Sequence, residues 1–256
     1  MIFVAQRGRP DLRTVVSFLT KRVKSTDEDD YKKMVCAIKY IRWTKLLRLP
    51  IEATYFNQNH WFINGAFAVH DNMRSHTEAY MTFGYDMLDG SVIGQKINTT
   101  SSTEAEVVAV HDNISAMLWV RYFLDVQCYL LKPTEVNQYN LSARLLETNG
   151  RGSSSKRTWH MNIRFFLANI QRRRYINIVC CPIDEMIGDF FTKPLGGAKF
   201  RRFCNIIMNI RYDEYVLVEM DELTAIHNAK MERRIEMNQH RNDKNDGEKV
   251  SCAEHQ

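Results

Sequence analysis

The sequence lacks an apolar run of the roughly 18 residues that a membrane-spanning helix needs. Its opening segment turns basic after a few apolar positions, so the apolar centre of a secretory signal peptide is also missing there. The six cysteines are scattered, and none has the CxxC or Cys/His spacing of a metal site, which favours reduced thiols. We therefore expect a soluble, intracellular protein without a membrane partner. Nucleus and cytoplasm both stay open, as does the oligomeric state.

Acidic residues are absent between Glu147 and Asp184, where seven basic residues fall. This stretch predicts either a surface that follows nucleic-acid phosphates or a solvated basic face. The candidate nucleic-acid contacts in it are Arg151, Lys156, Arg157, Arg172, Arg173 and Arg174.

The net charge of +5 conceals an uneven distribution. From residue 213 onward the chain has eleven acids and six Lys/Arg, a net charge of −5; subtracting this from +5 leaves +10 on residues 1–212. The 45% hydrophobic content is enough for the core of one or two domains. The polar end of the chain has too few apolar residues to order itself.

Hydrophobic periodicity predicts a mixed α/β layout. Apolar residues at helical spacing predict a helical hairpin over 10–49. Three runs of strand character with intervening turn residues predict an antiparallel meander. The runs lie around 60–70, 79–87 and 91–98. The later segments predict strands at 135–140 and 174–181 and helices at 141–150, 158–171, 183–194 and 198–210.

A long helix is predicted to start near residue 101. Ser101 with Glu104, and Thr103 with Glu106, form two overlapping S/T-x-x-E capping patterns. Apolar residues then recur with helical period as far as Phe123.

Four motifs in this order resemble the C-terminal part of copia-type retrotransposon polyproteins: RGRPDL (7–12), SSTEAE (101–106), SSSKRTWHMNIRFF (153–166) and DEMIGDFFTKPL (184–195). The resemblance covers roughly residues 5–210. It implies a helical remnant of the reverse transcriptase C-terminal region at 1–50 and a ribonuclease H domain at 51–212. Residues 213–256 would be an acidic, partly helical or disordered tail.

The resemblance implies a ribonuclease-H-like α/β fold, a mixed sheet flanked by helices, and an ancestral activity on the RNA strand of RNA–DNA hybrids. That hydrolysis uses two Mg²⁺ ions held by acidic residues. In the family the polymerase's catalytic Asp pair lies upstream of the region matched by residue 1, so no polymerase activity is expected. The Asp29-Asp30 pair is interpreted as a solvated helix start.

Two of the family's four metal-binding acids are retained. The second falls on Glu106 and the fourth on Asp189. Both are candidate catalytic and metal-binding residues. Without the motif context, each would be interpreted as an ordinary acid at a helix start.

The other two acids are replaced. Phe67, Ala68, Val69 and His70 fix the register that places Asn64 at the first acid, and Asn140, Ser142 and Ala143 fix the register that places Tyr139 at the third. Because an amide or phenol does not neutralise two divalent cations, metal binding and hydrolysis are expected to be severely weakened or absent.

Three hypotheses follow. The chain is a degenerate ribonuclease H that uses Mg²⁺ if any activity remains, a non-catalytic nucleic-acid-binding module, or a decaying element fragment without selected function. RNA–DNA hybrid or another nucleic acid is the expected partner.

Overall fold

The computed structural model describes residues 1–54, 56–70, 72–84, 86–149, 161–192 and 195–210. The predicted acidic tail at 213–256 lies outside the described residues. So do Arg151, Lys156 and Arg157 of the basic stretch.

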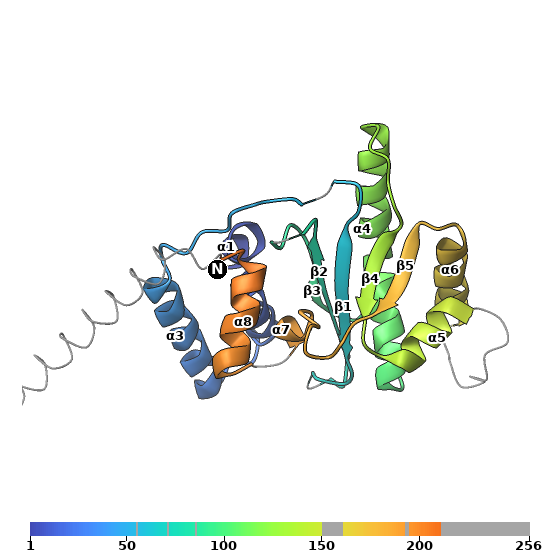
Figure 1. The fold of residues 1–256 in the computed structure, drawn as a ribbon. Coiled ribbons are helices and arrows are strands. Elements are labelled where there is room, and N and C mark those ends of the chain that lie inside the picture. Colours follow the sequence, from blue (N-terminus) through green and yellow to red (C-terminus); the bar gives the residue numbers. More distant parts are fainter. Residues whose placement is uncertain (55, 71, 85, 150–160, 193–194, 211–256) are drawn as a thin grey trace, which may run out of the picture. The chain divides into compact units, whose positions relative to one another are not determined.

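Five strands form one mixed sheet in the order β3-β2-β1-β4-β5 (Figure 1). β2 pairs antiparallel with both β1 and β3, whereas β4 runs parallel to β1 and β5 parallel to β4. The strands are β1 (His60–Ala66), β2 (His76–Thr82), β3 (Val92–Gly94), β4 (Thr134–Gln138) and β5 (Ile176–Cys180).

Helices supply the crossovers that parallel neighbouring strands require. The helix α4 joins β3 to β4, and α5 and α6 lie between β4 and β5. They span Ser102–Val126, Leu141–Asn149 and Met161–Arg172. A three-stranded meander followed by two parallel strands, with helices on the sheet, is the ribonuclease-H-like α/β fold that the resemblance implies, so the predicted fold class is confirmed.

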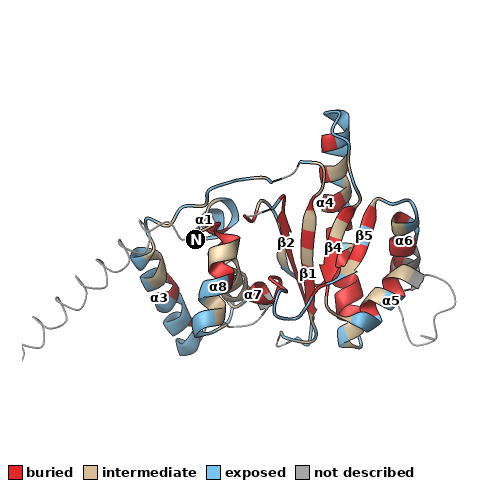
Figure 2. Ribbon diagram, in the orientation of Figure 1, coloured by how far each residue is buried: buried red, intermediate tan, exposed pale blue. Residues whose placement is uncertain are grey.

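Alternation along β1 divides the core between the two faces of the sheet. Trp61 and Ile63 pack with buried residues of α4, including Val108. Phe62 belongs to a second cluster with Tyr80 and Phe191 on the opposite face. Figure 2 shows the buried residues concentrated in the central strands and in stripes along the flanking helices.

The remaining helices are α1 (Ile2–Arg7), α2 (Arg13–Lys21), α3 (Glu28–Trp43), α7 (Asp189–Thr192) and α8 (Gly197–Ile207), with a 3-10 turn, η1, at Pro10–Leu12. The hydroxyl of Thr14 on α2 donates to the backbone oxygen of Phe190, and that of Ser17 donates to Val92, both at 3.2 Å. These bonds hold α2 to α7 and to the edge strand β3.

The predicted helical hairpin corresponds to α2 and α3. Its acidic pair lies at a helix start as expected, but only Asp29 is solvated, because Asp30 is buried and pairs with Arg22 at 2.6 Å. Asp27 caps α3 by accepting from the backbone of Asp30, and Asp30 accepts in return from the backbone of Asp27. Asp29 forms an ion pair with Lys33 one turn later.

Several predicted boundaries differ from the structure. The second strand runs from 76 to 82 instead of 79 to 87, because Gly84 has a φ of +149° and turns the chain after Thr82. The first strand ends at Ala66, since Ala68 has a φ of 52°. Of the helix predicted over 183–194, the structure describes residues as far as 192, and among these only Asp189–Thr192 is helical. The helix α1 was not predicted. No helix within the described ranges is long and apolar enough to cross a membrane.

Candidate active site

The N-terminal end of α4 places Glu106 against the C-terminal end of β1. Ser101 caps the helix by accepting from the backbone of Glu104 at 3.2 Å, which selects the first of the two predicted capping patterns. Glu106 is buried, and its Oε2 accepts from the backbone N–H of Gly65 at 2.9 Å. A Cβ on Gly65 would lie 2.4 Å from the backbone oxygen of Ala105, so only glycine permits this approach.

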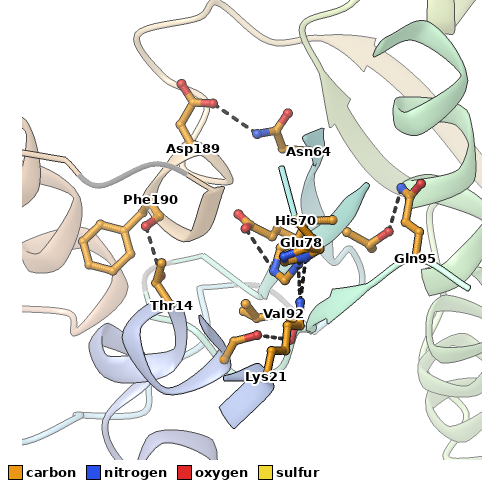
Figure 3. Close-up of polar contacts among 12 residues, drawn as sticks. Thr14, Lys21, Asn64, His70, Glu78, Val92, Gln95, Asp189 and Phe190 are labelled. Carbon is orange, nitrogen blue, oxygen red and sulfur yellow. Dashed lines mark hydrogen bonds and ion pairs between the residues drawn. The ribbon is translucent and has the colours of Figure 1, made fainter. Parts of the chain in front are cut away.

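Asn64 and Asp189 meet although they are far apart in the sequence (Figure 3). Both are buried, and the Asn64 Nδ2 donates to Oδ1 of Asp189 at 3.2 Å. Oδ2 of Asp189 lies 3.8 Å from the ammonium of Lys199 on α8. The structure therefore brings together the first and fourth of the four predicted positions.

Tyr139 follows the last residue of β4 and reaches Glu106. Burial raises the pKa of the Tyr139 phenol, and the charge of Glu106 and a side-chain hydrogen bond to it raise the pKa further. The charge of Asp189 adds to the shift. The phenol is thus held in its protonated form and donates to the Glu106 carboxylate.

Each retained acid therefore accepts a hydrogen bond from a replaced position. Asp189 is bound by the Asn64 amide, and Glu106 by the Tyr139 hydroxyl. These donors compete for the carboxylate oxygens that would ligate a cation.

The donor set does not fit two divalent metal ions. Mg²⁺ prefers oxygen ligands with enough negative charge to offset its own, and two of the four positions now carry neutral groups. Within the described ranges, no three His, Cys, Asp or Glu side chains gather as they would around one metal ion.

Sequence reasoning missed a third carboxyl group near Glu106. Glu147 on α5 is fully buried, and this burial, reinforced by the charge of Glu106, raises its pKa to about 8. Its position was readable from the helix: Ala143, one turn earlier on the same face, is also buried.

Glu78 was also missed as part of this region. It lies directly opposite Asn64 in the antiparallel pair of β1 and β2, so the two side chains share one face of the sheet. Nε2 of His76 lies 3.4 Å from Oε1 of Glu78.

The described part of the basic stretch lies at the end of α6. Arg172, Arg173 and Arg174 are exposed, and Arg174 has a φ of 57° in the turn before β5. Their role in binding nucleic acid stays a prediction.

No protein-family model matches the chain. Among solved structures, it is similar to LC11 ribonuclease H1, isolated from compost by a metagenomic approach. Sequence identity is 17%, the match covers 53% of this chain and 92% of that one, and the TM-score is 0.40. It is also similar to ribonuclease H1 from the halophilic archaeon Halobacterium salinarum, at 15% identity over 49% of this chain and 86% of that one, with a TM-score of 0.30. The fold class stated above rests on strand order and helix placement.

Proposed function

We propose that this chain is the C-terminal part of a copia-type retrotransposon polyprotein, with a ribonuclease H domain that binds RNA–DNA hybrid but hydrolyses it weakly or not at all. The observation that supports impaired hydrolysis is the pairing of both retained acids with replaced neighbours: Asn64 with Asp189, and Tyr139 with Glu106.

Hydrolysis is impaired by the loss of negative charge as well as by the geometry of the site. Two-metal hydrolysis requires carboxylates that hold the ions against their mutual repulsion. Restoring Asp at both replaced positions would add two negative charges and remove both hydrogen-bond donors. Any activity that remains would use Mg²⁺.

The domain assignment follows the resemblance. Residues 1–50 are a remnant of the reverse transcriptase, 51–212 the ribonuclease H domain, and 213–256 an acidic extension. The basic residues between Arg151 and Arg174 are the proposed contacts with hybrid phosphates.

The decisive experiment is a double reversion, Asn64→Asp with Tyr139→Asp, assayed on a labelled RNA–DNA hybrid with Mg²⁺ or Mn²⁺. We expect the reverted protein to cleave about 100-fold faster or more than the unmodified chain, because metal ions supply several kcal/mol of transition-state stabilisation. Calorimetric Mn²⁺ binding should be tighter in the reverted protein.

The matched control is Asn64→Ala with Tyr139→Ala, which removes the same donors without adding charge and should not gain activity. If the unmodified protein cleaves as fast as the reverted one, the proposed impairment is wrong. If the reverted protein folds but neither binds hybrid nor cleaves it, the ribonuclease H assignment fails.

A further inference from the structure

A hollow of about 510 Å³ lies between α2 and the loop that joins β1 to β2. Its volume is within the range of small-molecule sites. Its lining includes Lys21, Arg22, His70 and Arg74, with the polar side chains of Ser25 and Asn72. Among the described residues, no acid lines it.

Lys21 is held at the hollow by two imidazoles. Its Nζ lies 2.8 Å from Nε2 of His70 and 2.9 Å from Nδ1 of His76. An ammonium group only donates, so an imidazole nitrogen that receives its proton must accept. The two imidazole nitrogens also lie 2.9 Å apart, so Lys21, His70 and His76 form one hydrogen-bonded cluster.

A hydrogen bond from Lys21 to Nδ1 of His76 requires that the neutral ring carry its proton on Nε2, which faces Glu78 at 3.4 Å. Burial, followed by the charges of Lys21 and His70, lowers the pKa of His76 to about 3, so its ring is neutral at physiological pH. His76 therefore positions Lys21 without adding a positive charge beside it.

Among the described residues, Glu78 is the acid whose charge acts on the Lys21 ammonium. Its carboxylate raises the pKa of Lys21, but burial outweighs it and lowers that pKa to about 8. An ammonium has three N–H bonds and at most two of them point to the imidazoles, which leaves at least one for a ligand. An anion in the hollow would add countercharge.

Arg74 supplies a second cation from another wall of the hollow. It is exposed and lies on the loop between β1 and β2. Arg22 also lines the hollow, but its charge is already paired with Asp27 at 2.8 Å and with Asp30 at 2.6 Å, so we do not assign it to the ligand. Guanidinium and ammonium groups facing one space are the donors that proteins use for phosphate.

We propose that this hollow is a phosphate-binding site in which Lys21 and Arg74 contact the anion and His70 and His76 position Lys21. Its ligand is a phosphate group, carried either by a free nucleotide or by a nucleic-acid strand. The site goes beyond the proposed function, because it uses none of the four positions assigned to hydrolysis.

The test is calorimetric titration of the full chain with three probes: inorganic phosphate, a nucleoside 5′-monophosphate, and a short oligodeoxythymidylate without terminal phosphates. The unphosphorylated nucleoside is the blank. Stronger binding of the monophosphate indicates a free nucleotide, and stronger binding of the oligomer indicates a strand. Either result supports the site if it depends on the two cations.

Lys21→Met and Arg74→Gln should each weaken phosphate-dependent binding about tenfold or more, because each removes a charge-assisted contact. Lys39→Met is the matched control, since Lys39 is exposed on α3 and does not line the hollow. His70 and His76 ring resonances should shift on adding phosphate to the unmodified chain and not to Lys21→Met.

Phosphate binding that is undetectable, or that neither variant weakens, overturns the proposal. If Lys21→Met fails to fold, Arg74→Gln on the exposed loop still decides. The site and the proposed function fail separately: the double reversion at Asn64 and Tyr139 reports on hydrolysis, while the Arg74 variant reports on the hollow.

Discussion

At the scale of single residues, Glu147 makes stability depend on pH. Its pKa is about 8 in the folded chain against 4.5 for an ordinary glutamate, so between these values folding takes up a proton. Its contribution to stability is complete below pH 4.5 and is lost as the pH rises through about 8. The slope approaches about 1.4 kcal/mol per pH unit.

Glu147→Gln should therefore flatten the decline in stability across this range, measured as urea midpoints at several pH values. The glutamine keeps the shape of the buried side chain but has no proton to lose. Glu185→Gln, at an exposed carboxyl group, is the control and should leave the profile unaltered. A decline equally steep in Glu147→Gln would contradict the assignment.

Motif register allowed the four site positions to be identified from sequence, but not how they interact. Asn64 and Tyr139 were placed by their neighbours in the chain, whereas their bonds to Asp189 and Glu106 depend on how distant segments pack. The cluster of Lys21, His70 and His76 was not predicted, for the same reason. Its members come from α2, the loop after β1 and the start of β2, and no short-range pattern connects them.

At the scale of secondary-structure elements, the contact between β1 and α4 determines where Glu106 lies. A Cβ at Gly65 would lie 2.6 Å from the Ala105 carbonyl carbon and 2.8 Å from the Glu106 nitrogen. Both are backbone atoms in the first turn of α4, so the helix itself would have to move.

Gly65→Ala should lower the free energy of unfolding by roughly 1–3 kcal/mol, the usual cost of overpacking, measured by urea denaturation. Gly8→Ala is the control: a Cβ there meets nothing within 4 Å and the backbone φ is −146°. Equal stability of the two variants would mean that β1 and α4 are not in close contact at Gly65.

Element types were more predictable than element ends. The long helix and the two parallel strands followed from caps, period and β-branched residues, which act locally. The end of β2 depends on the backbone conformation at Gly84. Apolar alternation continues past this residue in the sequence, so the pattern did not reveal where the strand ends. The apolar positions predicted a helix over 183–194, but of the described residues 183–192 only Asp189–Thr192 forms one.

At the scale of the whole molecule, the N-terminal segment completes the core on one face of the sheet. Leu47 and Leu49 pack on the cluster that contains Tyr80 and Phe203. The Tyr40 hydroxyl on α3 donates to Asp11 at 2.8 Å and lies 3.6 Å from Sγ of Cys204 on α8. The proposed boundary at residue 50 therefore separates two segments that resemble different proteins, but the two segments pack together without a gap.

A chain of residues 51–212 should consequently be much less stable than a chain of residues 1–212. Removing the first 50 residues uncovers the apolar face around Phe190 and Phe203 and deletes Lys21 from beside His76. Exposed apolar surface costs about 25 cal/mol per Å², so losing a layer of helices uses up much of a domain's marginal stability. Thermal melts of the two chains, with a dye that binds exposed apolar surface, measure the difference. Equal midpoints and equal dye binding would show that the sheet, α4 and α8 form a stable core by themselves, and that α2 and α3 do not contribute to its stability.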